Sequence, residues 1–319
     1  ESDNTEAETA EELAIQQMSE AEDLLTASLN LEVDESFLDV HYRSRNEDLI
    51  GFSNTAFYSS RLQPIPGHPK NKALDTPIKI VNINGTYEDR TNKAEAIAAV
   101  ELIAELLNDP NPPSIGVACF NINQRDLILD VLNDKAADHT EFASLLSVAK
   151  NRKGSDSFEG LFVRNLENVQ GDERDVIIIS TTFGKDAEGK FRRNFGALSR
   201  SGGEKRLNVL VTRARKEIHV LTSIPEEEYR STMAPASGRP NGRHQLYGYL
   251  RYAENVRAAY QNYHDYLETL KVEEEVSCNI QHTLHPSTLA TELGEQLRDP
   301  NEIGSTVHWG NDGFCVDVA

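Results

Sequence analysis

The sequence predicts an α/β protein built around a parallel β-sheet with helices on both faces. Two observations lead to this prediction. Short runs of β-branched and aliphatic residues recur between residues 77 and 223. Longer segments with apolar residues at helical spacing alternate with them. Strands that alternate with helices are typical of parallel sheets that are buried on both faces.

The first half of this pattern supplies two strands and two helices. PIKIVNIN, residues 77–84, predicts a strand, and residues 91–107 predict a helix with Thr91 as its N-cap. Residues 115–120 predict a buried strand, and residues 123–132 a helix. Because ligands bind at the carboxyl ends of strands in such sheets, we expect the loops there to carry the chemistry.

The second half continues the alternation. Residues 161–164 and 176–182 predict two further strands, residues 204–215 a helix, and residues 218–223 a final strand. Ahead of the sheet, residues 37–40 are a short strand candidate. Together these segments complete the predicted sheet and its covering helices.

The C-terminal part departs from the alternating pattern. GRPNG, residues 238–242, interrupts it, and residues 245–270 predict one long or two short helices rich in tyrosine. Residues 288–297 are another helix candidate. A Gly-rich turn at 304–313 precedes a strand-like segment, residues 314–319.

The charge of the chain is distributed unevenly. The net charge is −20, but residues 1–40 hold thirteen acidic residues and no Lys or Arg, which leaves −7 for the rest. The first twelve residues indicate a solvated, disordered tail, and residues 14–29 a helix. Residues 191–220 carry eight Lys or Arg against two Glu. Such a basic patch can bind phosphate on an otherwise acidic chain.

Composition narrows the class of protein. The apolar fraction of 38% favours some chain outside a core. The separated Cys119, Cys278 and Cys315 fit neither a disulfide framework nor a zinc site, so we expect a reducing cytoplasm. No apolar run approaches the ~18 residues of a membrane span, and the acidic start does not resemble a signal peptide. With Glu1 first and only two methionines, we expect a piece of a longer protein.

Two segments have the residue types of a nucleotide site: ENVQGDERDVIIIS at 167–180 and RLNVLVTRAR at 206–215. In the first, Gly171 allows close approach of the backbone to a ligand, and Glu173 can accept hydrogen bonds from ribose hydroxyls. In the second, Arg213 and Arg215 offer permanently charged guanidinium groups that match phosphate oxygens. An arginine on a γ-phosphate stabilises the transferring phosphoryl group.

These two segments resemble motifs V and VI of superfamily 1 helicases, especially the branch that includes the nonsense-mediated-decay helicases. HYRSR at 41–45 resembles the tyrosine–arginine motif of that family, and VACFNINQRDLI at 117–128 resembles motif IV. The four motifs occur in family order over about 175 residues. The resemblance implies a RecA-like second motor domain of an ATP-dependent DNA or RNA helicase.

The resemblance also assigns roles to single residues. It implies that Arg43 reaches ATP, that Tyr42 stacks on the adenine, and that Arg213 is the arginine finger. Glu173 matches the glutamate that contacts the ribose, and Gly171 the glycine beside it. In motif IV, Gln124 and Arg125 match positions whose roles vary more, and we expect Gln124 at the nucleotide.

One departure from the family limits what this chain does alone. The sequence has no G-x-x-x-x-G-K-[ST] loop to cradle phosphates, and its Asp34-Glu35 pair is a poor match to a Mg²⁺-binding motif. The resemblance places these parts in an upstream RecA-like domain of the same polypeptide. We therefore expect ATP with Mg²⁺ to act in the full-length enzyme. Alone, this chain should neither bind ATP tightly nor hydrolyse it.

A second resemblance concerns the C-terminus. STLATELGEQL at 287–297 and STVHWGNDGFCVDVA at 305–319 resemble the opening of a PD-(D/E)xK-type nuclease domain related to very-short-patch repair endonucleases. It implies that Asp317 is the first metal-binding acid and Glu292 a nearby carboxylate. The other metal ligands are absent from the sequence, so we expect no metal site in this chain by itself.

The resemblances divide the chain into four parts. Residues 1–36 form an acidic tail with a linker helix, 37–225 the RecA-like domain, 226–283 a helical extension, and 284–319 the start of a nuclease-like domain. The expected partners are DNA or RNA, as a single strand or a duplex junction, and the upstream motor domain. A rival hypothesis is a non-catalytic module that binds nucleic acid or assembles a nuclease-associated protein.

Several side chains have a structural alternative. Arg45 is left undecided, and Arg215 is equally a partner for an acid such as Glu173. A basic cluster is either a solvated face or a strand-binding surface, and it consists of Arg192, Arg193, Arg200, Lys205 and Arg206. The C-terminal tyrosines favour packing over base stacking, and they are Tyr247, Tyr249, Tyr252, Tyr260, Tyr263 and Tyr266.

Overall fold

The computed structural model describes residues 28, 36–65, 76–154, 158–231, 240–270, 307–311 and 314–318. The chain divides into two compact units, Glu1–Val40 and His41–Ala319. Of the first unit, only Ser28, which is helical, and residues 36–40 are described. The helix expected at 14–29 otherwise lies outside the described residues, as does the one expected at 288–297.

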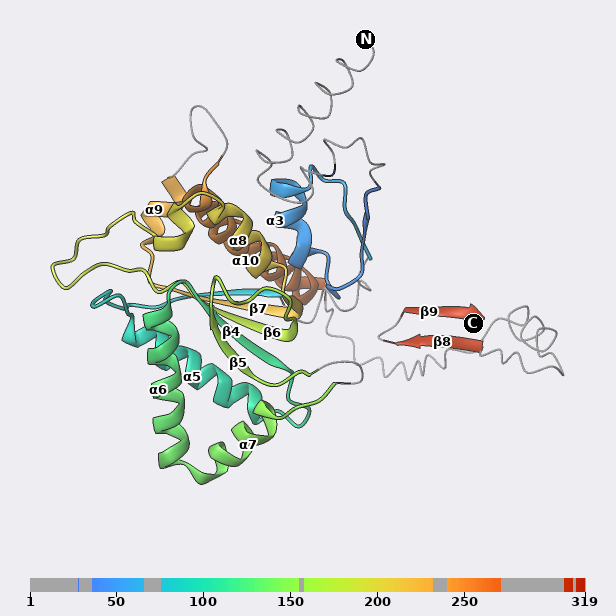
Figure 1. Cartoon of the computed structure of the whole chain (residues 1–319). Coiled ribbons are helices and arrows are strands. Elements are labelled where there is room, and N and C mark those ends of the chain that lie inside the picture. The colour runs from blue at the N-terminus through green and yellow to red at the C-terminus, as the bar shows by residue number, and fades with distance from the viewer. Residues whose placement is uncertain are drawn as a thin grey trace, which may run out of the picture. The chain divides into compact units, whose positions relative to one another are not determined.

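A five-stranded parallel sheet forms the centre of the second unit (Figure 1). Its strands are β3 (Ile78–Asn82), β4 (Ile115–Cys119), β5 (Phe162–Asn165), β6 (Arg174–Ser180) and β7 (Ala214–Thr222). Their order in the sheet is β3-β7-β6-β4-β5. Every residue of β4 and β6 is buried, which explains the apolar run that forms β4 and the one at the centre of β6, residues 176–179. The predicted α/β fold with a parallel sheet is confirmed.

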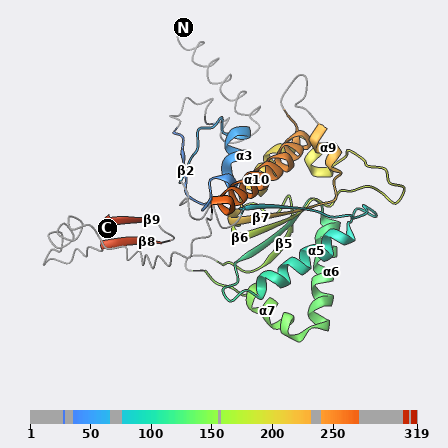
Figure 2. The same ribbon diagram turned by 180° about the vertical axis from the view of Figure 1, so that it is seen from behind.

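Helices cover both faces of this sheet, as the two opposite views show (Figures 1 and 2). One face carries α5 (Lys93–Leu107), α6 (Ile122–Asp138) and α7 (Thr140–Lys150). Their apolar side chains and those of the sheet form one core cluster, which includes Ile103, Ile128 and Leu146. We did not predict α7 as a helix, and α6 continues six residues beyond its predicted end at residue 132.

The opposite face carries α3 (Asp48–Phe57), α8 (Gly203–Val211) and α10 (Gly242–Leu270), with the short η1 (Gly196–Ser199) and α9 (Glu226–Ser231) beside them. A second core cluster joins these helices to the sheet. Two tyrosines of α10, Tyr247 and Tyr249, are buried in this cluster, so packing accounts for them. Two others, Tyr252 and Tyr260, donate hydrogen bonds to Asp48 at the start of α3.

Two small β-structures lie outside the main sheet. The strands β1 (Val40–His41) and β2 (Gln63–Pro64) pair with each other. The strands β8 (Val307–Asn311) and β9 (Phe314–Val318) form an antiparallel hairpin. The expected strand at the C-terminus is therefore present, but part of the expected Gly-rich turn is the strand β8. No helix among the described residues is long and apolar enough to cross a membrane.

Two predicted helix ends were wrong. The N-cap of α5 is Asn92 rather than Thr91, because the Asn92 side chain accepts a hydrogen bond from the Glu95 amide at 3.1 Å. The second wrong end is the C-terminus of α8, which lies at Val211 and not at residue 215 as predicted. The Thr212 hydroxyl donates to the Asn208 carbonyl at 2.9 Å, and the chain then enters β7. Arg213 therefore lies in the turn between helix and strand.

Candidate nucleotide half-site and strand pocket

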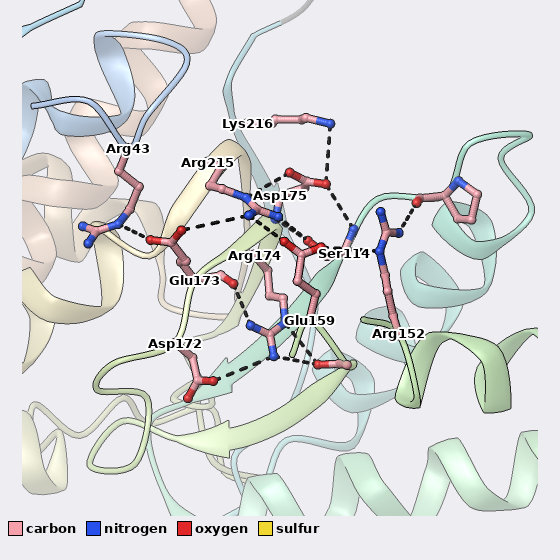
Figure 3. Close-up of polar contacts among 12 residues, drawn as sticks. Arg43, Ser114, Arg152, Glu159, Asp172, Glu173, Arg174, Asp175, Arg215 and Lys216 are labelled. Atoms are coloured by element: carbon pink, nitrogen blue, oxygen red, sulfur yellow. Dashed lines mark hydrogen bonds and ion pairs between the residues drawn. The ribbon is translucent and has the colours of Figure 1, made fainter. Parts of the chain in front are cut away.

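Three of the predicted site residues meet at the amino end of the sheet. Glu173 directly precedes β6, Arg213 directly precedes β7, and Arg43 lies on the segment after β1. The Arg43 Nε donates to the Glu173 Oε2 at 2.6 Å (Figure 3). The pair remains partly exposed, with 27% of the Arg43 side chain and 41% of the Glu173 side chain accessible. A ligand can therefore reach both groups.

Arg213 lies beside this pair and is half-buried. Its Nε donates to the Val209 carbonyl at 2.7 Å, at the end of α8, and its Nη2 donates to the Thr212 hydroxyl at 3.3 Å. Burial lowers the pKa of Arg213, and the nearby positive charge of Arg43 lowers it further. In the described part of the chain no carboxylate forms an ion pair with Arg213. Two neighbouring cations with one carboxylate near them suit an anionic ligand that also carries hydroxyl groups.

Arg215 has a different environment. Its Nη1 lies 2.7 Å from the Glu159 Oε1, its Nε lies 3.1 Å from the Asp175 Oδ1, and its Nη2 donates to the Ser114 hydroxyl at 3.0 Å (Figure 3). Burial raises the pKa of Asp175, but Arg215 and Lys216 outweigh it and hold the pKa below its usual value. Glu173 is 4.0 Å away. Arg215 is thus the structural partner of acids, chiefly Glu159 and Asp175.

The turn before β6 explains its glycine. Gly171 has φ of +90°, a conformation in which side chains are strained, while a Cβ at this position would meet nothing within 4 Å. The need for glycine is therefore conformational. Next to it, Asp172 forms an ion pair with Arg164 of β5, which fixes the turn that presents Glu173.

The two other predicted nucleotide contacts, Tyr42 and Gln124, differ in how exposed their side chains are. Tyr42 is 79% exposed next to Arg43, so its ring is accessible. Gln124 is fully buried, contrary to our expectation of a ligand contact. Its Oε1 accepts from the Asn92 amide at 2.7 Å, and its Nε2 donates to the Asn92 carbonyl and the Ser180 hydroxyl. In this structure Gln124 joins α6 to the start of α5 and the end of β6.

The carboxyl end of the sheet, where we expected the chemistry, does not hold the arginine–glutamate group. It holds a separate pocket of about 490 Å³. We call it the strand pocket, and it is lined by Tyr87, Arg90, Phe120, Asn121, Ile122, Asn123, Asn165, Glu167, Phe183, Asn194, Gly196, Ala197 and Arg200.

The strand pocket combines features that favour phosphate. It lies at the N-terminus of α6, a helix of 17 residues whose N-cap is Asn121. Arg90 is at the tip of a tight turn between Glu88 and Thr91, and its carbonyl accepts from the Asn121 side chain at 3.0 Å. Arg200, from the predicted basic cluster, also lines the pocket. The sequence analysis missed Arg90 and Asn121, although the Asn-Ile-Asn before an amphipathic segment was a usable N-cap signal.

The rest of the predicted basic cluster is partly neutralised. Arg193 forms two hydrogen bonds with the Glu228 carboxylate, the shorter at 2.7 Å. Arg192 lies 3.6 Å from Asp186. Arg206 donates to the carbonyls of Ala197 and Ser201. Among the described residues, no group of three or more His, Cys, Asp or Glu side chains is arranged to hold a metal ion.

Comparison with known proteins identifies the family. A family model described as an AAA domain matches residues 17–224, about two thirds of the chain. The chain belongs to the AAA domain family. The uncharacterized ATP-dependent helicase MG140 of Mycoplasma genitalium is 36% identical over 224 residues, which are 69% of this chain and 18% of that protein. Its Mycoplasma pneumoniae homolog is 34% identical over the same shares.

This AAA domain thus spans less than a fifth of the curated relatives that it matches. A solved structure, the C-terminal domain of a possible DNA helicase from Lactobacillus plantarum WCFS1, aligns with a TM-score of 0.33 at 15% identity. The alignment covers 63% of this chain and 94% of that one. The family match thus shows an AAA domain, and the curated relatives that share this region are named as ATP-dependent helicases.

Proposed function

We propose that the AAA domain is the second motor domain of an ATP-dependent superfamily 1 helicase, of the branch that resembles nonsense-mediated-decay helicases. The grouping of Arg43, Glu173 and Arg213 at one end of the sheet is the observation that supports it most. These residues come from three segments far apart in the sequence. Each segment has the motif that the family uses at its ATP site.

In this proposal each side chain has one task. Arg213 lies on the γ-phosphate, where its charge stabilises the phosphoryl group as it transfers. Arg43 contacts the phosphates as a second cation, and Tyr42 stacks on the adenine. Glu173 accepts hydrogen bonds from the ribose hydroxyls. The first motor domain supplies the phosphate-cradling loop and Mg²⁺, so ATP brings the two domains together and hydrolysis releases them.

The Arg43–Glu173 ion pair has a place in this cycle. Both groups are engaged with each other at 2.6 Å. An arriving nucleotide offers phosphate to the arginine and hydroxyls to the glutamate, so each side chain exchanges one hydrogen-bonding partner for another. The exchange costs little because exposed ion pairs contribute only about 0–1 kcal/mol.

The strand pocket is our proposed contact with DNA or RNA. Its helix N-terminus, Arg90 and Arg200 suit phosphate groups, while the rings of Tyr87 and Phe183 border the same space. Contacts of this kind do not depend on base sequence and weaken as salt rises. The relatives are named as helicases, which agrees with a nucleic-acid partner.

The C-terminal resemblance adds a separate proposal, that residues from 284 onward begin a nuclease domain in the longer protein. Asp317 lies on β9, and Glu292 lies outside the described residues. Replacing Asp317 by Asn in the full-length protein should abolish Mg²⁺-dependent cleavage of DNA. Cleavage at the rate of the unchanged protein would refute this part alone.

The central test is steady-state ATPase activity of the full-length helicase with a saturating single strand. Arg213→Ala should lower turnover roughly a thousandfold or more, while nucleotide binding is retained. Arg230→Ala is the matched control, since Arg230 is exposed and forms ion pairs only with Glu226 of α9 and Glu254 of α10 among the described residues. Unchanged turnover in Arg213→Ala would overturn the motor proposal in favour of a non-catalytic binding or assembly module.

A further inference from the structure

A completely buried carboxyl group lies at the carboxyl end of the sheet. It belongs to Glu95, in the first turn of α5. The Ser180 hydroxyl donates to it at 2.6 Å, and the Thr182 amide donates at 2.7 Å. Ser223, just after β7, also hydrogen-bonds to it. One carboxyl group therefore joins α5 to the ends of two neighbouring strands.

Further hydrogen bonds extend this group to α6. Asn92 donates through its Nδ2 to the Ser223 hydroxyl at 2.9 Å, and its amide donates to the Gln124 side chain at 2.7 Å. Gln124 in turn reaches Ser180 at 3.2 Å. We call these five residues, Asn92, Glu95, Gln124, Ser180 and Ser223, the buried polar hub. A network of this kind is rigid when its members are satisfied.

A strained residue outside these five is hydrogen-bonded to the hub. Thr182 has φ of +69°, a conformation that is unfavourable for a β-branched side chain. Its amide is the group that donates to Glu95. Such strain persists only where the surroundings enforce it, and it concentrates at functional sites. The residue that follows is Phe183, whose ring borders the strand pocket and packs on Tyr87 at 5.3 Å between centroids.

Three of the segments that line the strand pocket are attached to the hub. Asn92 ends the loop that carries Tyr87 and Arg90. Gln124 lies in the first turn of α6, directly after the pocket residues at 121–123. Thr182 begins the loop that leads through Phe183 to Arg200. The three segments come from distant parts of the sequence, and the hub is where they are bonded together.

We propose that Glu95 is a positioning residue for nucleic-acid binding, because its carboxyl group fixes the Arg90 loop, the α6 N-terminus and the loop after β6 relative to one another. This inference rests on the proposed function, since it takes the strand pocket as the contact with DNA or RNA. Glu95 touches no ligand itself. Its effect passes through the backbone at Thr182 and through Asn92.

The test uses the full-length helicase and single-stranded oligonucleotides of DNA and of RNA. Glu95→Gln keeps the size of the side chain but turns one acceptor into a donor, so the hub loses an acceptor. In an assay at about pH 8, where Glu95 is mostly ionised, the strand concentration for half-maximal ATPase activity should rise about tenfold, the size expected when a hydrogen bond to a charged group is lost. The KM for ATP and kcat at saturating strand should not change.

A second substitution separates positioning from simple destabilisation. Glycine accepts positive φ without strain, so adding Thr182→Gly to Glu95→Gln should restore much of the strand affinity. A loss that only reflects weaker folding would not be repaired in this way. Ser180→Ala removes one donor to Glu95, and it should give a smaller shift of the same kind if Glu95→Gln does not fold.

The outcomes distinguish this inference from the proposal beneath it. The double variant Arg90→Ala, Arg200→Ala probes the strand pocket itself, and unchanged strand affinity there would refute the pocket as the binding site. If that variant weakens binding while Glu95→Gln and Ser180→Ala do not, the positioning role is overturned. An equal loss of ATP and strand affinity in Glu95→Gln would also overturn it.

Discussion

Arginines that lie close together in this domain have different tasks. The side chain of Arg215 has four hydrogen-bonding or ionic partners, and two of them are nearly buried acids. Arg43 has one exposed carboxylate partner. Arg213 rests on the end of a helix without an ion-pair partner among the described residues. Charge alone does not separate these residues, whereas their partners do.

This difference predicts that substitutions of Arg215 and of Arg43 lower the stability of the domain by unequal amounts. Arg215→Ala leaves Glu159 and Asp175 without their main cation, and we expect the free energy of unfolding to fall by about 3 kcal/mol. Arg43→Ala breaks an exposed pair and should cost less than about 1 kcal/mol. Urea denaturation of the two variants measures both values. Equal losses would contradict the division between structural and ligand-binding arginines.

Glu95 predicts a pH dependence of stability. Burial raises its pKa from 4.5 to about 7, although the hydrogen bonds from Ser180 and Thr182 oppose the shift. The folded protein therefore binds more protons than the unfolded chain in this window. Stability should fall by about 3 kcal/mol as pH rises from 4.5 to about 7, and then level off.

The measurement is a series of denaturation curves between pH 4.5 and 8. Glu95→Gln carries no titrating group, so its curve should lack this part of the slope, whatever its absolute stability. Parallel curves for the two proteins would show that Glu95 does not titrate in this range.

At this scale the sequence predicts which residues to examine but not their surroundings. The motifs select Arg43, Glu173 and Arg213, and the structure places these three residues near one another. Their roles at ATP stay predictions. The motif predicted that Gln124 contacts the nucleotide. In the structure its side chain is buried and forms three hydrogen bonds within the protein. Glu95 was missed, since an acid in the first turn of a helix ordinarily indicates only a favourable charge at the helix N-terminus.

At the level of elements, the strands were the most predictable. All five strands of the sheet were located to within about two residues at most ends, because buried parallel strands are continuous apolar runs. The helices α3 and α7 were not predicted. In α3, a glycine and several small polar residues obscure the helical spacing, and only Leu49, Ile50 and Ser53 are buried. Contacts with α8 and α10, which the local sequence does not reveal, stabilise it.

The start of α5 gives an element-level prediction. Asn92→Ala removes the N-cap and the bond to Ser223, so the free energy of unfolding should fall by about 2 kcal/mol. Thr91→Ala removes only an exposed hydrogen bond to the Glu88 carbonyl and should cost less than about 0.5 kcal/mol. Thermal unfolding of the pair decides which residue caps the helix. A larger loss for Thr91→Ala would restore the original assignment.

For the whole molecule, the two candidate sites lie at opposite ends of one sheet. Sequence analysis predicted the sheet and a ligand site at the carboxyl ends of the strands, where the strand pocket lies. It did not predict that the arginine–glutamate group lies at the amino ends, because the general rule describes domains that hold a complete ligand site. Here the residues before β6 and β7 complete, in our proposal, a site whose other half belongs to another domain.

Because the proposed ATP site is incomplete in this chain, we predict that the chain alone does not hydrolyse ATP. No phosphate-cradling motif occurs in these 319 residues, so we expect no ATP hydrolysis from this chain alone, with or without single-stranded nucleic acid. The measurement is phosphate release by the purified chain, beside the Arg213→Ala variant as a control for contaminating ATPases. Strand-stimulated activity that disappears in the variant would refute the expectation.

The strand β7 joins the two ends. It starts directly after Arg213, ends directly before Ser223, and is hydrogen-bonded to β3 and β6 along its sides. Its nine residues span roughly 30 Å, and a strand held on both sides bends little. In the proposed motor the sheet therefore moves as a rigid body. When ATP binding tilts the sheet at its amino end, the nucleic acid at its carboxyl end is displaced by a distance that grows with the length of β7.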